Sequence, residues 1–443
     1  AAAALSAGGP EAGGDGTCDA GPGEQCSGIS GTLELAWRTF TALPAEYDLA
    51  TALGCGKVNS ADAPADNIVD FCTATRPEFA AHCDMARADL PAETRKECLY
   101  RCMFGTADLN IYQVPNPGEP DPHVVVMMSP MSEIGYAMTP FLDNRSLPFS
   151  YSQCKFMVKF EQMRHLAEFG SKERGVVAGK RVHFIFHLGH TGSTLLARAL
   201  GEIGGTFVLK EPPLLRQLAV GNAEATKARI SKLWQSLLLP WLSRRPRHTD
   251  TVVVKASSVS LHLMRMALKS ADARVVFMYS KLRTHLTILH ARPGDLFPED
   301  LFEGLDVKDK VFRMFTLDDL TFGQKLALTW MKRMLFVANL PQANVLRLDM
   351  NEFLAEPAKH LLEIGAHYGL PLESATADAI VGSGVFRTYS KDAGVQWNAT
   401  TQKTMLEGRA ATFGDSIEDG MAFARKLVKK YKTLKRLKDL IEG

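Results

Sequence analysis

The chain has 443 residues, of which 46% are hydrophobic and 23% are charged, and its net charge is +2. These values are ordinary for a soluble globular protein of two or three domains, and so small a charge gives no reason to expect a nucleic-acid partner. No window approaches the roughly 18 uninterrupted apolar residues that a membrane-spanning helix needs, so we expect no transmembrane segment.

Residues 1–30 are predicted to be a disordered, low-complexity start. The opening "AAAALSAGGPEAGGDG" lacks the basic residues and the apolar run of a signal peptide. A second region over 31–150 is cysteine-rich and mainly helical, and its role is unknown. Its patterns predict short helices over 31–110, a proline-rich break at "VPNPGEPDP" and a strand at "HVVVMM". A further helix is expected around "FMVKFEQMRHLAEFG".

Cysteines are concentrated at the start of the chain. The first quarter holds seven of the eight, and only Cys154 comes later: Cys18, Cys26, Cys55, Cys72, Cys83, Cys98 and Cys102. No CxxC pair is present, which disfavours a zinc site. Buried free thiols and disulfides both stay open, with 105 pairings for eight cysteines. The compartment is therefore open too: the cytoplasm is slightly favoured, and the secretory lumen stays possible.

From Val182 short apolar and β-branched runs alternate with longer helical patterns. The predicted strands are 182–188, 206–210, 251–255, 274–279 and 344–348. The predicted helices are 193–203, 222–243, 258–270 and 322–340, followed by a long amphipathic helix over 417–441. Strands that alternate with helices indicate a mostly parallel sheet covered on both faces. We assign this sheet to a domain over 175–443.

The first predicted strand leads into the turn "GHTGST". Gly189 and Gly192 allow the backbone to turn tightly and to approach a ligand. Ser193 and Thr194 begin the next helix, where amides, hydroxyls and the helix dipole can hold a phosphate-like group. The lysine of a nucleotide-hydrolysing P-loop is absent, so a triphosphate fits poorly. The alternative is a plain turn in which Ser193 and Thr194 cap the helix.

Glu211 and Lys255 end the second and third predicted strands. In a doubly wound sheet, such strand ends line the ligand crevice beside the phosphate loop. There the Glu211 carboxylate could accept a proton, and the Lys255 amine could face an anion. The alternatives are a cap or a salt bridge with Lys210 or Arg216 for Glu211, and a side chain that reaches the surface for Lys255. Pro212 is expected to hold Glu211 extended, and His187 is expected to be a core histidine.

Five stretches together resemble the sulfotransferase family that uses 3′-phosphoadenosine 5′-phosphosulfate (PAPS). They are GHTGSTLL at 189–196, KEPP at 210–213, VVVKASS at 252–258, ADARVVFMYSKLRTHLT at 271–287 and VLRLDMNEFLAEP at 345–357. The resemblance spans roughly 182–372 and leaves residues 1–150 uncovered. It implies an α/β fold, a three-layer P-loop-type parallel sheet of the sulfotransferase-like kind, preceded by the cysteine-rich, mainly helical region.

The resemblance also implies roles for particular residues. Glu211 becomes the general base or the group that orients the acceptor, and Lys255 stabilises charge on the transferring group. His190 is the third catalytic candidate. The residues expected to bind PAPS are Gly189, His190, Thr191, Gly192, Ser193 and Thr194 in the loop, with Lys281, Arg283, Thr287 and Lys391 elsewhere.

The chain departs from the family at the positions that bind the phosphates. His190 stands where the loop usually has arginine or lysine. Tyr279 and Ser280 replace an Arg-Asp pair whose arginine grips the 3′-phosphate, and Leu282 replaces a second arginine. Thr287 keeps the hydroxyl expected of a 3′-phosphate-binding serine. The departures place the donor and the catalytic competence in doubt more than the fold.

We therefore predict an enzyme that moves a sulfuryl group from PAPS, as co-substrate, to a hydroxyl or amine, with no metal. Its partner is expected to be a small-molecule or glycan acceptor; the sequence does not indicate the oligomeric state. The alternative is a divergent, non-catalytic nucleotide-binding protein on the same fold. A small-molecule kinase is a further alternative, weakened by the missing P-loop lysine.

Overall fold

A computed structural model gives the structure of the chain. It describes residues 109–113, 123–128, 155–173, 181–220, 250–270, 272–290, 310–389, 392–396 and 399–442, with single residues among 91–99, 234–242 and 302–309. The predicted disordered start over 1–30, and most of the predicted helical region over 31–150, lie outside the described residues. Lys391 lies outside them as well.

A small antiparallel sheet precedes the main domain. Its strands β1 (Leu109–Gln113), β2 (His123–Met128) and β3 (Lys155–Lys159) are paired in chain order. Strand β2 has the predicted bounds. The helix expected around 156–170 is wrong in its first part, because 155–159 pairs along β2 as a strand. Tertiary pairing overrides the helical pattern there, and α7 begins only at Phe160 (Phe160–Glu173).

One cysteine of the N-terminal region can be placed. Cys98 is buried, lies in a helical segment and is disulfide-bonded. The disulfide alternative is therefore confirmed for Cys98. The other seven cysteines lie outside the described residues.

The main domain is built on a five-stranded parallel sheet. The strands are β4 (Arg181–His187), β5 (Thr206–Lys210), β6 (Thr251–Lys255), β7 (Val275–Tyr279) and β8 (Val345–Asp349), in the order β5-β6-β4-β7-β8. All four pairings are parallel. Each strand lies within one residue of its predicted bounds. The apolar, β-branched runs are typical of strands that are buried on both faces.

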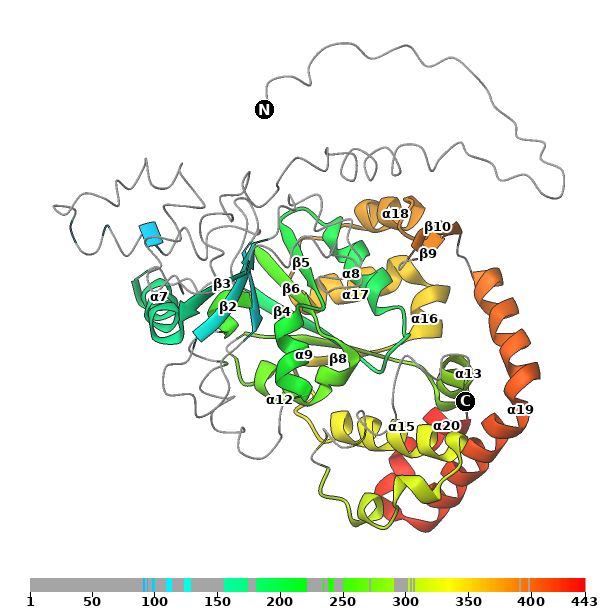
Figure 1. The fold of residues 1–443 in the computed structure, drawn as a ribbon. Helices are drawn as coiled ribbons and strands as arrows, with labels where there is room; N and C mark the ends of the chain where they lie inside the picture. The colour runs from blue at the N-terminus through cyan, green and yellow to red at the C-terminus, as the bar shows by residue number, and fades with distance from the viewer. Residues whose placement is uncertain are drawn as a thin grey trace, which may run out of the picture. The chain divides into compact units, whose positions relative to one another are not determined.

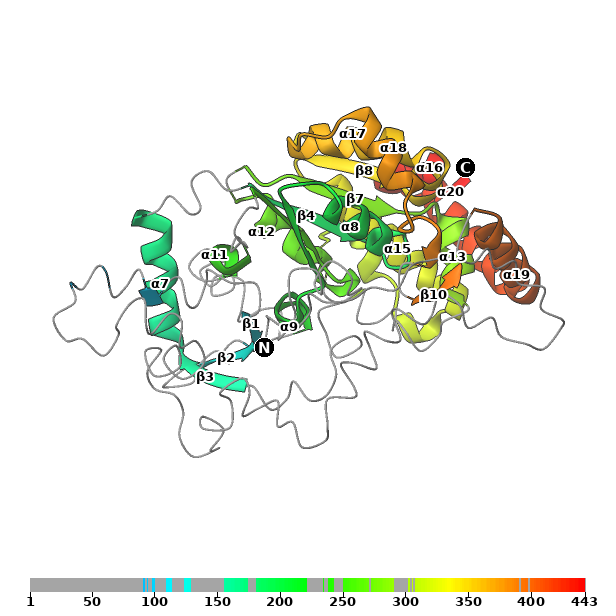
Figure 2. The same cartoon turned by 90° about the horizontal axis from the view of Figure 1, so that it is seen from above.

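Successive strand residues contribute to two different hydrophobic cores. On β6, Val252 and Val254 belong to one core and Val253 to the other, as the alternation of a strand requires. Four helices pack in the core of Val253: α8 (Ser193–Gly201), α16 (Met350–Ala355), α17 (Pro357–Tyr368) and α18 (Ser374–Gly382). The predicted three-layer α/β fold is confirmed. Figures 1 and 2 show the helices on both sides of the sheet.

The opposite core is larger. The helices that pack in it include α7, α9 (Pro213–Val220), α11 (Leu239–Leu242), α12 (Met264–Ala267), α13 (Leu282–His290), α15 (Phe322–Ala338) and α19 (Ala399–Lys430), with 3-10 helices η4 (Ser258–Leu263) and η5 (Lys310–Arg313). The predicted helix over 258–270 is thus divided into η4 and α12. The predicted helix over 222–243 lies largely outside the described residues, and α9 begins at Pro213, where the two prolines favour a helix start.

The C-terminal helix differs from its prediction over 417–441. Helix α19 begins earlier, at Ala399, is kinked at Phe413 and ends at Lys430. Tyr431 is extended, and η7 (Lys432–Leu437) and α20 (Lys438–Glu442) follow. The interruption turns the chain so that the apolar residues of η7 join the same buried core as α19. Burial in the core therefore overrides a continuous helical pattern. Figure 1 shows α19 along one side of the domain, with α15 beside its C-terminal part.

The remaining elements are η6 (Leu317–Asp319), β9 (Thr388–Tyr389) and β10 (Asp392–Gln396), of which β9 and β10 form a separate two-stranded antiparallel sheet.

Candidate functional site

The predicted phosphate loop lies at the centre of the carboxyl edge of the sheet. It follows β4, which is hydrogen-bonded to β6 on one side and to β7 on the other. From β4 the chain goes first to β5 and β6 on one side and then to β7 and β8 on the other. Ligands of open α/β sheets bind at this kind of switch point, outside the carboxyl ends of the strands.

The loop backbone is left-handed at three positions. The φ angles are 93° at Gly189, 51° at His190 and 72° at Gly192. Gly192 precedes α8 as its N-cap and makes no side-chain cap bond. A Cβ at Gly192 would lie 3.7 Å from Met350 Cγ and 3.8 Å from Met278 Cε, so the main strain of a substitution comes from the φ angle.

The first turn of α8 faces this loop with open donors. Ser193 and Thr194 are buried and occupy the first two helical positions rather than the cap. Their amides and that of Leu195 have no intrahelical acceptor, because the first intrahelical bond runs from Leu196 N to Gly192 O. Neither hydroxyl caps the helix, as the alternative interpretation would require. The geometry suits an anion held at a helix N-terminus.

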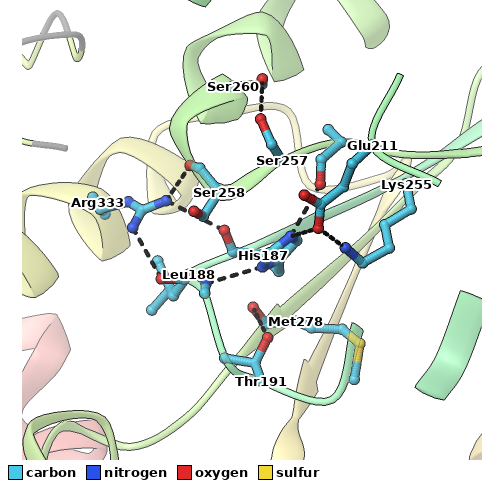
Figure 3. Close-up of polar contacts among 12 residues, drawn as sticks. His187, Leu188, Thr191, Glu211, Lys255, Ser257, Ser258, Ser260, Met278 and Arg333 are labelled. Carbon is cyan, nitrogen blue, oxygen red and sulfur yellow. Dashed lines mark hydrogen bonds and ion pairs between the residues drawn. The ribbon is translucent and has the colours of Figure 1, made fainter. Parts of the chain in front are cut away.

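The two residues predicted at the strand ends lie together beside the loop. Lys255 Nζ donates to Glu211 Oε1 in a buried ion pair, with side-chain exposures of 1% and 10%. Lys255 does not reach the surface, so the alternative for this residue is wrong. Figure 3 shows the Glu211 carboxylate between the Lys255 amine and the His187 ring. The pair supplies a proton acceptor and a cation at one point.

The backbone of Glu211 is not extended, contrary to the expectation from Pro212. Its φ is 54°, which is rare for a residue with a side chain. Two contacts hold this conformation: the Glu211 amide donates to Lys255 O over 2.7 Å, and the carboxylate binds Lys255 Nζ. Such a conformation costs about 1–3 kcal/mol and is typical of functional sites. The pairing with β6 therefore overrides the local preference set by Pro212.

His187 connects the loop to the ion pair. Its Nδ1 accepts from the Gly189 amide over 2.9 Å, and its Nε2 lies 3.0 Å from Ala256 O. These two partners require the neutral tautomer with the proton on Nε2. The same Nε2 lies 4.0 Å from Glu211 Oε1. The expectation of a buried, satisfied histidine is confirmed, but its position in the site was not predicted.

The other predicted loop residues differ in exposure. Thr191 is fully buried, and its hydroxyl donates to Met278 O over 3.4 Å. His190 is half-buried. Its charge helps to lower the pKa of the buried His285 to about 3, after burial itself and the Arg333 charge. His285 is therefore neutral at physiological pH, and His190, His285 and Arg333 interact electrostatically.

Two of the residues predicted to bind the 3′-phosphate make contacts within the protein. Arg283 is exposed and donates to Glu418 Oε1 of α19 over 2.5 Å. The Thr287 hydroxyl is buried and donates to Arg283 O, four residues back along α13. Lys281 is half-buried just before α13. As described, the arginine and the threonine are engaged within the protein, which does not fit an anion shared by all three.

Tyr279, where the family has its 3′-phosphate arginine, lies near acidic side chains. Burial, and then the Asp349 and Glu352 charges, raise the pKa of Tyr279 to about 12. Asp349 ends β8 beside Tyr279 in the sheet and caps α16 through Oδ1. Carboxylates beside Tyr279 disfavour an anion there. The environment, and not only the residue type, departs from the family pattern.

Lys210 carries a pH-dependent stability effect. It is buried beside Lys255, and burial, then the Arg198 and Lys255 charges, lower its pKa to about 7. The unfolded chain thus binds more protons between about pH 7 and 10.5, so this residue makes stability rise with pH across that window. Lys210→Met should add most stability below pH 7, and the gain should shrink by up to roughly 1.4 kcal/mol per pH unit above it.

Denaturant unfolding at pH 6.5 and pH 9.5 measures this difference. The exposed Lys269→Met is the control and should change stability equally at the two pH values. An equal gain from Lys210→Met at both pH values would contradict the prediction.

Among the described residues, no group of three or more His, Cys, Asp and Glu side chains is arranged to hold a metal ion. None of the helices in the described ranges has the length and apolar character needed to cross a membrane.

Sequence reasoning missed Arg333, which reaches the loop from α15. Its guanidinium is 1% exposed and donates to the carbonyl oxygens of Leu188, His187 and Ser258 (Figure 3). The available signal was a pair of cations inside an otherwise apolar helical run, "LALTWMKRMLFVA". Charged residues in such a run are buried only with partners.

Comparison with known proteins gives similarity among solved structures alone. No protein-family model and no curated protein sequence matches the chain. A mouse sulfotransferase complexed with PAP is similar at 11% identity and TM-score 0.33, over 60% of this chain and 92% of that chain. A sulfotransferase domain from the Synechococcus PCC 7002 olefin synthase is similar at 13% identity and TM-score 0.32, over 55% and 94%.

A sulfotransferase from Mycobacterium avium is also similar, at 12% identity and TM-score 0.30, over 80% of this chain and 97% of that chain. These three solved structures are sulfotransferases, the family that the sequence motifs resemble. In these three comparisons the sequence identity is at most 13% and the TM-score at most 0.33.

Proposed function

We propose that the protein transfers a sulfuryl group from PAPS to a hydroxyl or amine of a small-molecule or glycan acceptor. One observation carries the proposal: a left-handed, glycine-capped loop leaves the first turn of α8 open beside the buried Glu211–Lys255 pair. The amides of that turn and the hydroxyls of Ser193 and Thr194 suit one phosphosulfate group. A lysine that reaches a γ-phosphate is not needed for such a ligand.

In this proposal each group has one task. Glu211 accepts the proton of the acceptor hydroxyl while the acceptor oxygen bonds to sulfur. The bond between sulfur and the bridging phosphate oxygen breaks, and the electron pair leaves with the 5′-phosphate. The α8 amides and Lys255 stabilise the negative charge that develops there. His187 positions the loop relative to Glu211 through the Gly189 amide.

Binding of 3′-phosphoadenosine 5′-phosphate (PAP), the desulfated product, tests the proposal. Calorimetry on the full chain should show saturable binding, and Ser193→Ala should weaken it about tenfold, because one hydrogen bond to a charged group is lost. The control is Thr412→Ala on the exposed surface of α19, which should leave binding unchanged. No PAP binding by the unmodified chain, together with no sulfate transfer from PAPS, would end the proposal.

A divergent nucleotide-binding protein without transfer activity is the second candidate. The ion pair of Arg283 with Glu418 and the carboxylates near Tyr279 favour it, because they leave the expected 3′-phosphate site incomplete. Adenosine 5′-phosphosulfate, which lacks the 3′-phosphate, separates the candidates. Equal affinity for donors with and without that phosphate would favour the second candidate or another donor.

A further inference from the structure

Arg333 is a buried cation that contacts the residues immediately before the phosphate loop. Its Nη1 donates to Leu188 O over 3.0 Å, and its Nη2 donates to His187 O over 3.2 Å and to Ser258 O over 2.5 Å. Leu188 immediately precedes the loop, and Ser258 begins η4 after β6. One side chain of α15 thus ties together the carboxyl ends of β4 and β6, as Figure 3 shows.

The charge of Arg333 has no acidic counterpart in the described part of the chain. Every hydrogen bond and ion pair found for its guanidinium there goes to a main-chain carbonyl. Burial lowers its pKa to about 9, so it still carries its charge at neutral pH. A buried charge that is compensated only by dipoles is unfavourable, and an anion nearby would complete its compensation.

The orientation of the carbonyls links this charge to the loop. Since the His187 and Leu188 carbonyls point to Arg333, the backbone leaves β4 in a fixed direction. The Gly189 amide, opposite the Leu188 carbonyl in the same peptide unit, points instead to His187 Nδ1. The first turn of α8, whose amides have no intrahelical acceptor, begins four residues after Gly189, at Ser193. The Arg333 charge also contributes to the low pKa of His285, which His190 of the loop perturbs as well.

The neighbouring cation on α15, Lys332, makes different contacts. Lys332 is also buried, but its Nζ donates to Phe302 O over 2.6 Å and lies over the Phe302 ring. Of these two adjacent buried cations, Arg333 alone contacts the strand end that leads into the loop. This difference provides a matched control.

We propose that Arg333, on α15, supplies positive charge to the phosphate-binding loop, in place of the basic residue that the loop lacks at His190. In the same contacts it fixes the direction in which the loop leaves β4. This inference rests on the proposed function for the identity of the bound anion, the phosphosulfate group. Arg333 is a positioning residue that acts through the loop, and it touches no reacting atom.

Three variants of the full chain test this role: Arg333→Met, Arg333→Lys and Lys332→Met. Binding of PAP and of inorganic pyrophosphate is measured by calorimetry, and folding by circular dichroism and thermal unfolding. We expect Arg333→Met to weaken both affinities about 10–100-fold, the usual size of an electrostatic coupling. Arg333→Lys keeps the charge and should recover most of that loss. Lys332→Met should change affinity less than about twofold, whatever its thermal stability.

Each outcome separates the claims. Folded Arg333→Met with unchanged pyrophosphate affinity would overturn the inference. Equal losses of affinity in Arg333→Lys and Arg333→Met would show that the charge of Arg333 does not contribute to binding. Only its role in positioning the loop would then remain. If Arg333→Met does not fold, Arg333→Lys is compared with Lys332→Met alone. A loss of anion affinity above tenfold in Arg333→Lys would then contradict a role for the charge. Pyrophosphate binding without PAP binding would end the proposed function and leave the inference intact.

Discussion

Gly323→Ala is expected to lower the free energy of unfolding by about 3 kcal/mol or more, at the upper end for overpacked sites. Gly323 lies in the first turn of α15, and a Cβ there would stand 2.0 Å from the main-chain oxygen of Ser416 in α19. No rotamer change relieves such an overlap, because both groups belong to helix backbones. The helices would have to separate, with loss of the packing between them. Denaturant unfolding and thermal melting measure the loss.

The facing glycine provides the companion variant and α19 itself provides the control. A Cβ at Gly420 would stand 2.6 Å from Gly323 O, so Gly420→Ala should destabilise through the same contact. Gly408 is exposed in the same helix and has no atom within 4 Å of its added Cβ. Gly408→Ala should therefore stabilise by about 0.5–1 kcal/mol through helix propensity. A melting temperature of Gly323→Ala equal to that of Gly408→Ala would contradict this account of the interface.

The contact between α15 and α19 also bears on the candidate site. Helix α15 carries Trp330, which donates to Ser280 O after β7, and Arg333, which holds the ends of β4 and β6. The position of α15 thus sets three strand ends around the loop. The glycine contact with α19 lies some two to three helical turns from these residues on the same helix. A shift of α15 would reach the loop through them.

The strands of the main sheet were predictable because their signal is local. A strand buried on both faces needs a short apolar, β-branched run, and β5 and β6 have the predicted bounds. The loop was predictable for a similar reason, since its glycines and hydroxyls are adjacent in the chain. Lys255 and Glu211 were predicted one at a time as strand ends. Their ion pair depends on the alignment of β5 with β6, which no local pattern encodes.

The unpredicted features are those that depend on distant segments. Arg333 follows the loop by more than 130 residues, and nothing within α15 indicates that its side chain meets the carbonyls at the end of β4. The left-handed backbone of Glu211 opposes its local preference and is held by β6. Helix α19 ends before η7, and the apolar residues of η7 are buried in the same core as α19. In each case long-range packing decides against the local pattern.

Under the proposed function, Glu211→Gln is expected to reduce sulfate transfer about 10²–10⁴-fold, the range for loss of a general base. The amide keeps the shape of the carboxylate but cannot accept a proton from the acceptor. It also leaves the Lys255 ammonium buried without its counter-charge, so stability should fall by about 3–5 kcal/mol. Transfer from PAPS and denaturant unfolding are measured on the same samples. Glu202→Gln, an exposed carboxylate just after α8, is the control for both.

The second variant, Lys255→Met, and the double variant separate catalysis from folding. Lys255→Met should also destabilise, because it leaves the Glu211 carboxylate without its partner. In Glu211→Gln with Lys255→Met both charges are gone, and most of the stability should return while transfer stays lost. The coupling of the two substitutions in stability is a direct measure of the pair. Additive losses would show that the pair is not coupled, and full activity of Glu211→Gln would remove Glu211 from the mechanism.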